Sequence, residues 1–580
     1  MARKPGPPND PLPDDSEGRL LRVGGDRGLS LGERLSARVS NSLYKTPLHR
    51  LRLRGRYPLK LLGVPDDPVP GDAAIGERIR AGRLVHAGHT AMTRDIRFRE
   101  AAPPAWRDWA NGWEWLRDLA ADVPDHKAGA VLAEPLVSRW LASFGEFEPQ
   151  AWRADVTGTR LLFALGHAPL ILSSADQIYR SLLLSALATW ARHLDRAAFR
   201  LPDGLARAKA LCGLYAAGLL IPGGEARAAA ALAALDRLLE AMVLPDGGIA
   251  TRAPVDALAL AELLLFTANA GPAIGMRPPP MFADTLARLV PSLFGMALGD
   301  AMVGAWHGGA PIAAVPLERL AKRSATGAAL ARAGRWSGFY RLSVAKTVLV
   351  IDAGPPPLAR VAAGGHAGTL AFELSDGIDR VITNCGGDRG LAVPLAGPLA
   401  AGLRTTAAHS TLTIADTNST RIRDDGALGL GVEEVTVQSR SSEEGQWLEA
   451  GHDGYAKRFG LMVRRRLFLS PDGQDLRGED VIEPAPKSPL KRRPERDFDL
   501  RFHLGPGVAA TPTADGAGAL LKLPQGRVWG MKARGGAVSI EPSLWVDPAG
   551  ILHKTQQLVI SGRTDKAAAS IGWSFKRAGK

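Results

Sequence analysis

Cysteine is scarce in this chain of 580 residues, which contains only Cys212 and Cys385. Two cysteines exclude a scaffold held by several disulfides and a zinc site built from thiolates. The first residues, MARKPGPPNDPLPDDSEGR, also lack the apolar core of a secretory signal and are typical of a polar leader. We therefore expect residues 1–27 to be disordered and the protein to be cytoplasmic.

Long apolar runs are missing as well. A membrane-spanning helix needs roughly 20 apolar residues. The most apolar stretch, SLLLSALATWARHL, is interrupted by Arg192 and His193. We expect no transmembrane segment.

Positive charge is in excess, with a formal net charge of +13 and an isoelectric point near 9.9. This balance favours an anionic partner, such as acidic polysaccharide, nucleic acid or a membrane surface, although a solvated basic surface is an equal alternative. No nucleic-acid-binding motif accompanies the basic residues, so nucleic acid is not the expected partner. The densest basic positions are Arg50, Arg52, Arg54, Arg56, Lys60, Arg464, Arg465 and Arg466.

The length and the change in composition predict two domains. Residues 28–330 are rich in Ala, Leu and Arg, whereas residues 331–580 are richer in Gly, Thr, Ser and Val. Apolar residues recur at helical spacing in the first domain, separated by Gly, Pro or Asp. The expected helical segments are 104–121, 131–145, 149–167, 174–196, 203–220, 225–243, 254–270 and 280–298.

Paired helices with short turns cannot bury their apolar faces singly, so we expect them to stack into a solenoid or a closed toroid. The second domain has short strands with frequent turn signals, such as SPDGQ, TADGAG, LPQGR and DPAG. That pattern is typical of an antiparallel β-sandwich. The cleft between the two domains is the expected site.

Two histidines mark the most informative region. His366 precedes the alternating stretch TLAFELS, and His409 precedes TLTIA, so we expect both on successive strands of one sheet. Rigidly held imidazoles suit a metal site or a proton-transfer site.

This region resembles the C-terminal domain of the heparinase II/III-like family. The matching pieces are HAGTLAFELS (366–375), NCG (384–386) and TTAAHSTL (405–412), in the family's order. The resemblance covers most of residues 335–485 and implies an incomplete (α/α) toroid packed on an antiparallel β-sandwich. It also implies β-elimination of a uronate-containing polysaccharide, and the export of the family's best-known members makes the cell envelope or periplasm the alternative location.

The resemblance implies zinc ligands at His366, Asn384 and His409. The family has an aspartate where this chain has Asn384. Two imidazoles and a carboxylate make a plausible structural zinc site, and an amide removes the negative charge that helps to hold the dication. The alternative is a buried, hydrogen-bonded pair of histidines without metal.

Several of the family's catalytic positions differ in this chain. The tyrosine acid/base falls on Asp256, a histidine falls on Gly364 and an aspartate falls on Gly368. The Asn and His expected earlier in the toroid are absent from LPDGLARAKALCGLYAAG. Either the chemistry has been rebuilt from other groups, or the protein binds glycan without cleaving it.

Four residues are candidates for a rebuilt lyase site. Arg404 could bind a uronate carboxylate through its fork of donors. His452 and Tyr455, in GHDGY, could serve as base and acid, and His307 lies in a glycine-rich connection near the domain junction. The alternatives are a turn histidine, a buried tyrosine with a paired hydroxyl and a loop histidine.

We therefore predict a polysaccharide lyase that acts on an acidic, uronate-containing glycan. The alternative is a catalytically degenerate protein of the same fold that binds glycan or associates with the envelope. A third possibility is an intracellular enzyme with another anionic substrate. The sequence carries no signal for the oligomeric state.

Overall fold

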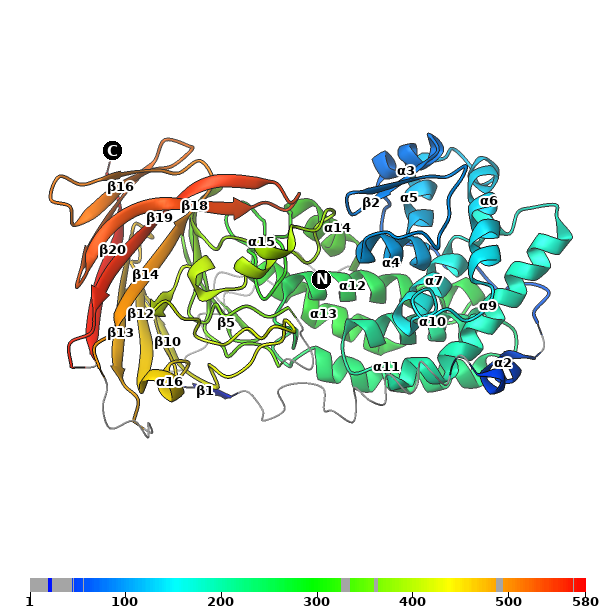
Figure 1. Ribbon diagram of the computed structural model, residues 1–580, viewed down its shortest axis with the longest axis horizontal. Coiled ribbons are helices and arrows are strands. Elements are labelled where there is room, and N and C mark those ends of the chain that lie inside the picture. The colour runs from blue at the N-terminus through cyan, green and yellow to red at the C-terminus, as the bar shows by residue number, and fades with distance from the viewer. Residues whose placement is uncertain are drawn as a thin grey trace, which may run out of the picture.

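The computed structural model describes residues 19–22, 44, 46–55, 57–324, 334–358, 364–486, 494–566 and 568–579. A helical domain and a β-domain lie side by side along the long axis of the molecule (Figure 1). The predicted order, helices first and antiparallel strands second, is confirmed. The predicted boundary at residues 330 and 331 lies outside the described residues.

The predicted disordered leader, residues 1–27, also lies outside the described residues, apart from one short segment. Arg19–Arg22 form strand β1, which pairs antiparallel with β10 (Glu434–Ser442) at the edge of a sheet. The sequence did not predict this strand, because the four residues RLLR are too few to show the alternation of apolar and polar side chains that marks a strand.

Eight predicted helical segments all correspond to observed helices. Breaks at Gly, Pro and Asp fix the ends: the Asp176 carboxylate, for example, accepts the backbone N–H groups of Ile178 and Tyr179 at the start of a helix. The helices are α2 (Pro47–Leu53), α3 (Ala73–Arg80), α4 (Pro104–Gly112), α5 (Trp115–Asp122), α6 (His126–Phe144), α7 (Ala154–Gly166), α8 (Ala168–Ile171), α9 (Gln177–Ala197), α10 (Leu205–Leu220), α11 (Glu225–Met242), α12 (Pro254–Ala268), α13 (Pro280–Gly295) and α14 (Ala314–Ser324).

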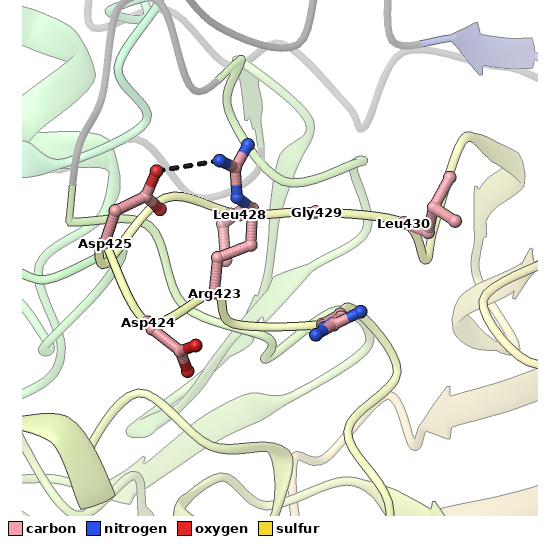
Figure 2. A pocket seen from close by; sticks show the side chains of 7 residues that line it. Arg423, Asp424, Asp425, Leu428, Gly429 and Leu430 are labelled. Atoms are coloured by element: carbon pink, nitrogen blue, oxygen red, sulfur yellow. Dashed lines mark hydrogen bonds and ion pairs between the residues drawn. The ribbon is translucent and has the colours of Figure 1, made fainter.

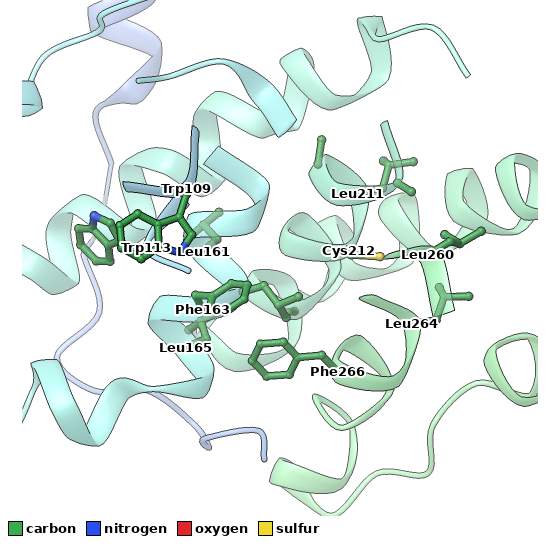
Figure 3. Close-up of a cluster of buried hydrophobic side chains, with 14 of the residues drawn as sticks. Trp109, Trp113, Leu161, Phe163, Leu165, Leu211, Cys212, Leu260, Leu264 and Phe266 are labelled. Carbon is green, nitrogen blue, oxygen red and sulfur yellow. The ribbon is translucent and has the colours of Figure 1, made fainter. Parts of the chain in front are cut away.

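The core of the helical domain is aromatic and aliphatic, and Trp113, Leu161, Phe163 and Phe266 meet within it (Figure 3). Deeper in the same core, the guanidinium of Arg160 lies 4.2 Å from the ring centroid of Trp140 and donates to two backbone carbonyls. Burial lowers the pKa of Arg160 well below its ordinary value. The charge is tolerated because aromatic faces and carbonyl oxygens replace water around it.

One segment of the helical domain, Pro254–Ile274, is long and apolar enough to cross a bilayer, judged by length and composition alone. The described residues contain no second segment of this kind. Its helix α12 packs against α10 and α13, and the side chains of Leu260 and Leu264 are fully buried. Helix α12 also carries Asp256 and Glu262, and its contacts place it among the other helices of the domain.

The β-domain is a sandwich of two antiparallel sheets. The described strands of one sheet run β1-β10-β11-β12-β13-β20-β17-β16-β15, and those of the other run β18-β19-β14-β8-β7-β6-β5-β4, with β9 beside β14. The bounds are β4 (Gly334–Trp336), β5 (Phe339–Val344), β6 (Thr347–Asp352), β7 (Phe372–Asp376), β8 (Asp379–Thr383), β9 (Leu412–Ile414), β10 (Glu434–Ser442), β11 (Gly445–His452), β12 (Leu461–Leu469), β13 (Asp475–Pro484), β14 (Asp497–Leu504), β15 (Ala509–Pro512), β16 (Gly518–Lys522), β17 (Val528–Arg534), β18 (Ala537–Val546), β19 (Leu552–Arg563) and β20 (Ala569–Arg577). A separate hairpin of β2 (Arg83–His86) and β3 (His89–Met92) belongs to the helical domain.

Aromatic rings join the two sheets across the sandwich. Phe502 on β14 and Trp573 on β20 have ring centroids 4.9 Å apart, and Phe372 on β7 stacks on the same indole. Beside them a fully buried ion pair joins β12 to β13, because Arg465 Nε donates to Asp480 Oδ1 at 2.8 Å.

Helices α7 and α10 approach so closely that only glycine fits at their crossing. A Cβ on Gly213 would lie 2.1 Å from the carbonyl oxygen of Gly158. We predict that Gly213→Val lowers the free energy of unfolding by about 2 to 3 kcal/mol, because the helices must separate. Thermal unfolding followed by tryptophan fluorescence measures the effect, with Gly402→Ala, which meets no atom within 4 Å, as the control. Equal midpoints for the two variants would contradict this packing.

Candidate functional site at the domain junction

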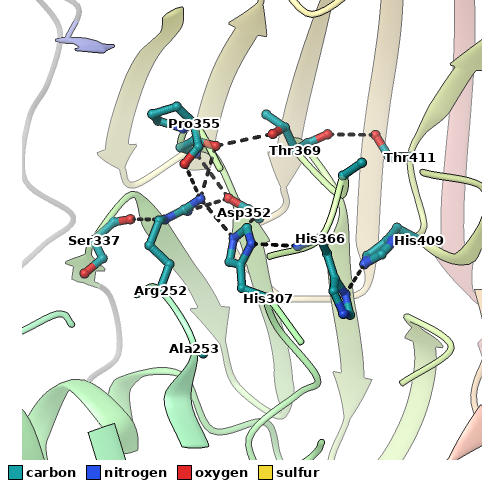
Figure 4. A network of polar contacts seen from close by, with 12 residues as sticks. Arg252, Ala253, His307, Ser337, Asp352, Pro355, His366, Thr369, His409 and Thr411 are labelled. Carbon is teal, nitrogen blue, oxygen red and sulfur yellow. Dashed lines mark hydrogen bonds and ion pairs between the residues drawn. The ribbon is translucent and has the colours of Figure 1, made fainter. Parts of the chain in front are cut away.

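A buried arginine connects the two domains. Arg252 follows α11, and its side chain reaches into the β-domain (Figure 4). Its Nη2 donates to Asp352 Oδ1 at 2.5 Å, its Nε to Ser337 O at 2.6 Å and its Nη1 to Pro355 O at 2.7 Å. The side chain also lies over the ring of Phe339 at 4.6 Å. The guanidinium is therefore both neutralised and hydrogen-bonded, as a buried charge must be.

Asp352 ends strand β6 and binds His307 as well as Arg252. His307 Nε2 lies 3.0 Å from Asp352 Oδ2, and His307 Nδ1 accepts the backbone N–H of His366 at 3.4 Å. His307 Nε2 also lies 3.0 Å from Arg252 Nη1, so this nitrogen contacts both members of the ion pair. Burial alone would raise the pKa of Asp352, but the charge of Arg252 and the hydrogen bonds outweigh it and hold this pKa below its ordinary value.

His366 and His409 meet directly. His366 Nδ1 lies 2.9 Å from His409 Nε2, and His409 Nδ1 donates to Thr405 O at 2.7 Å. His366 therefore donates to His409, and both rings are neutral. Burial lowers the pKa of His409 to about 4 and holds the pKa of His366 well below its ordinary value.

The expectation that both histidines lie on strands is wrong in detail. His366 lies in the glycine-rich segment before β7, and His409 lies between a short 3-10 turn and β9. Glycines around His366 and a left-handed backbone at Leu370 (φ 68°) prevent a regular ladder there. Hydrogen bonds hold these segments instead: Ala367 N donates to Arg404 O, and Arg465 Nη1 donates to the carbonyls of Leu370 and Ser410.

Asn384 lies near this pair but is bonded to other groups. Its Oδ1 accepts the backbone N–H of Ser410 at 3.0 Å, and its Nδ2 donates to Glu373 Oε1 at 3.3 Å. Glu373 in turn pairs with Arg380 at 3.1 Å. Asn384 thus orients the segment that carries His409.

His366 and His409 bond each other, Asn384 bonds Ser410 and Glu373, and this arrangement does not fit a zinc centre. The imidazole nitrogens that would face a metal face each other, and the Asn384 oxygen accepts a backbone proton. Across the described part of the chain, no group of three or more His, Cys, Asp or Glu residues could hold a metal ion. Zinc binding stays a prediction, which elemental analysis of the purified chain tests.

Asp256, where the resemblance leads us to expect a tyrosine acid/base, forms an ion pair with Arg389. Arg389 Nη1 donates to both oxygens of Asp256, at 2.8 and 3.0 Å, and Arg389 Nη2 donates to His307 O at 3.0 Å. Gly364 lies against the same guanidinium, since a Cβ there would be 3.2 Å from Arg389 Nε. Arg389 therefore fills the space between helix α12 and the segment before His366.

Arg404 lies beside the segment that carries His366 and binds backbone carbonyls. Its Nη2 donates to Gly365 O at 2.8 Å and to Gly426 O at 2.6 Å. The side chain thus joins the segment next to His366 to a surface hairpin, residues 421–430, which Figure 2 shows from close by. Its role as a carboxylate ligand stays a prediction.

His452 and Tyr455 lie together at the end of strand β11. Their ring centroids are 5.8 Å apart, and each side chain is only 1% exposed. The Tyr455 hydroxyl bonds the carbonyls of Leu412 and Thr417, and His452 Nδ1 accepts the N–H of Gly454. Burial raises the pKa of Tyr455. The roles of base and acid stay predictions, and the local contacts are those of a buried turn.

The structure adds Arg252, Asp352 and Arg389 to the residues that the sequence suggested. The signal for Asp352 is a carboxylate at the end of the otherwise apolar strand TVLVID. Arg252 and Arg389 carry no comparable signal, because arginine is common throughout this chain. The cavity that Arg252 lines has a volume of only about 10 Å³, no more than one water molecule.

Comparisons with known proteins identify the family. The family model described as Heparinase II/III-like, C-terminal, matches residues 326–574. FtsZ-localized protein C of Caulobacter vibrioides is 30% identical over 552 residues, which are 91% of this chain and 92% of that protein. A crystal structure of heparinase III matches with a TM-score of 0.69 and 13% identity, over 94% of this chain and 89% of that one. Heparan sulfate lyase HepC from Pedobacter heparinus matches with a TM-score of 0.61 and 13% identity, over 94% and 88%.

The fold is thus that of the heparinases, a helical toroid followed by a β-sandwich, as predicted. The chain belongs to the heparinase II/III-like family.

The buried ion pair of Arg252 and Asp352 provides a test of the junction. Asp352→Asn leaves the Arg252 charge buried without its counterion, so we predict a loss of about 3 to 5 kcal/mol in the free energy of unfolding. Asp256→Asn removes the partner of Arg389, whose side chain is 37% exposed, so the expected loss is about 1 kcal/mol or less. Thermal unfolding of the two variants should give a clear difference in midpoint, and similar midpoints would contradict the structural role of Asp352.

Acid should destabilise the protein through histidines that are buried in the neutral state. Burial lowers the pKa of His193 and that of His452, each to about 3, from an ordinary value of 6.5. Below pH 6.5 these histidines therefore bind more protons in the unfolded chain than in the folded protein. Their contribution to stability is fully present above pH 6.5 and is lost as the pH falls toward 3. At pH 5.5 each histidine should cost about 1 kcal/mol.

Thermal midpoints measured between pH 7.5 and 5 should fall steadily. The slope should be smaller in a His193→Gln variant. An identical slope in that variant would contradict the assignment for His193.

Proposed function

We propose that this protein is a non-cleaving member of the heparinase II/III-like family that works in cell division at the site occupied by FtsZ. The observation that carries the first part is the ion pair of Arg389 and Asp256. It stands where the family resemblance leads us to expect a tyrosine acid/base. Both groups are engaged with each other, which leaves neither available to move a proton on a sugar.

The remaining proton-transfer candidates support the same proposal. β-Elimination needs a base within reach of the C5 proton and an acid near the leaving oxygen. His307, His366 and His409 are buried and hydrogen-bonded within the protein. His452 and Tyr455 are bonded to backbone groups at 1% exposure.

The similarity to FtsZ-localized protein C supports the second part. It runs over 91% of this chain and includes both domains, so it is not confined to a shared module. Similarity over both domains supports the proposal that this protein and FtsZ-localized protein C occur at the same place in the cell. The proposal includes the cytoplasmic location that we expect from the sequence.

A lyase that cleaves an acidic, uronate-containing polysaccharide is the second candidate. The heparinase III fold and the net charge of +13 favour it. In that case Arg404 would have to leave its backbone partners to bind a substrate carboxylate.

Two measurements separate these functions. A fluorescent fusion expressed in the source organism should concentrate at the division site together with FtsZ and disperse when FtsZ is depleted. The purified protein should release no ultraviolet-absorbing unsaturated product from heparin, heparan sulfate or alginate. A diffuse fusion would overturn the place in cell division, and product formation from any of these polymers would overturn the non-cleaving role in favour of the lyase.

A further inference from the structure

An exposed apolar segment begins at α2, at the end of the helical domain that lies farthest from the β-domain (Figure 1). Its exposed large apolar side chains are Leu48, Leu51, Tyr57, Leu59, Leu62 and Val64. Leu59 is 92% exposed, so it projects into solvent almost completely. Exposed apolar side chains at this density mark a surface that meets a partner.

Helix α2 presents two of these leucines because its opposite face is fixed to the domain. His49 Nε2 lies 3.3 Å from His193 Nδ1, and the rings of His49 and Tyr44 have centroids 4.8 Å apart. Leu48 and Leu51 are 55% and 56% exposed. Residues three apart are neighbours on a helix surface, so these two leucines form one outward apolar face.

Backbone contacts fix the rest of the segment. The Leu53 carbonyl accepts Arg192 Nη1 at 3.1 Å, and Leu62 N donates to Leu220 O at 2.9 Å. The guanidinium of Arg192 also lies 5.2 Å from the ring centroid of Tyr57. The exposed side chains are therefore held by an ordered backbone, which reduces the entropy lost on binding.

The loop after α12 extends the same surface. A Cβ on Gly63 would lie 2.2 Å from Ala273 O, so this loop packs directly against the segment. The loop adds Met276, which is 53% exposed, and the exposed Arg277. We call residues 47–64 together with residues 272–277 the basic apolar surface.

Positive charge is in excess along this surface. By sequence, residues 45–66 carry six basic side chains and one carboxylate: Lys45, Arg50, Arg52, Arg54, Arg56 and Lys60 against Asp66. Glu146, next to a phenylalanine that packs on His49, and Asp195 are further carboxylates nearby. Asp195 is paired with Arg227. Counting all three carboxylates still leaves the segment positive.

An anionic lipid bilayer satisfies both features of the surface at once. Basic residues bind its headgroups, and leucines placed between them enter the boundary of the acyl chains. Tyrosine, as at position 57, is enriched at membrane interfaces. An acidic glycan or a nucleic acid would engage the cations and leave Leu59 in water. A bound peptide would require a groove, whereas Leu59 projects from the surface.

We propose that the basic apolar surface docks the protein on an anionic membrane. Arg52, Arg54 and Lys60 contact lipid headgroups, and the leucine side chains beside them insert below. The inference is argued from this surface alone and adds a membrane to the proposed function.

Flotation of the full chain with lipid vesicles tests the proposal. The protein should float with vesicles of equal parts phosphatidylglycerol and phosphatidylcholine, less so as salt rises, and should not float with pure phosphatidylcholine. The triple variant Arg52→Glu, Arg54→Glu, Lys60→Glu should lose about tenfold or more in affinity, because each cation near an anionic surface adds to binding. The double variant Leu51→Ser, Leu59→Ser should lose severalfold.

Matched variants on the β-domain control for net charge and for apolar content. Arg440→Glu, Lys522→Glu, Lys532→Glu changes the charge equally at exposed positions, and Ile551→Ser, Leu552→Ser removes two exposed apolar side chains. Both should bind like the wild type. Equal thermal midpoints of variants and wild type show that a loss of binding is local.

Three outcomes would overturn the inference. The first is a wild type that does not float with the anionic vesicles, and the second is a triple variant that floats as well as the wild type. The third is unchanged binding by the Leu51→Ser, Leu59→Ser variant together with displacement by heparin, which would assign the surface to an acidic polymer. Failed flotation with the fusion still at the division site sinks this inference alone, and the reverse outcome sinks only the proposed function.

Discussion

The buried ion pair of Arg252 and Asp352 is the interaction on which the domain junction depends. Removing both charges from water is costly, and the cost is offset only because every donor of the guanidinium has a partner nearby. The same carboxylate holds His307, which in turn accepts the backbone N–H of His366. A single charge pair thus positions residues from the helical domain and from the sandwich at once. The left-handed backbones of Arg252 and His307, at φ 55° and 46°, are held by these contacts.

A second buried ion pair also contacts the segments that carry the two histidines. Arg465 is paired with Asp480 inside the sandwich and also donates to the carbonyls of Leu370 and Ser410, which lie beyond the two histidines. Arg465 therefore holds both segments directly, and Arg252 holds the segment of His366 through Asp352 and His307. Burial keeps both imidazoles neutral and bonded to each other. His366 and His409 are almost fully buried, at 1% and 2% exposure.

The sequence predicted the architecture well and the contacts less well. Helical periodicity located the helices between residues 104 and 298 and missed α2, α3 and α14. HAGTLAFELS and TTAAHSTL correctly brought His366 and His409 together. Their strand context was wrong, because glycines and a short 3-10 turn interrupt the sheet at those points. The partnership of Arg252 with Asp352 spans 100 positions and leaves no local pattern. GHDGY placed His452 beside Tyr455, but a turn motif does not reveal whether its side chains face solvent or the core.

Hydrogen exchange followed by mass spectrometry tests the central claim, that the histidine segments are a buried structural clamp and not an open catalytic cleft. Peptides covering residues 364–371 and 404–411 lack regular strands, yet they should exchange as slowly as the core strands β12 and β14. Slow exchange that Asp352→Asn accelerates is the result that this account predicts. Fast exchange of both peptides in the wild-type protein, at the rate of exposed loops, would contradict it.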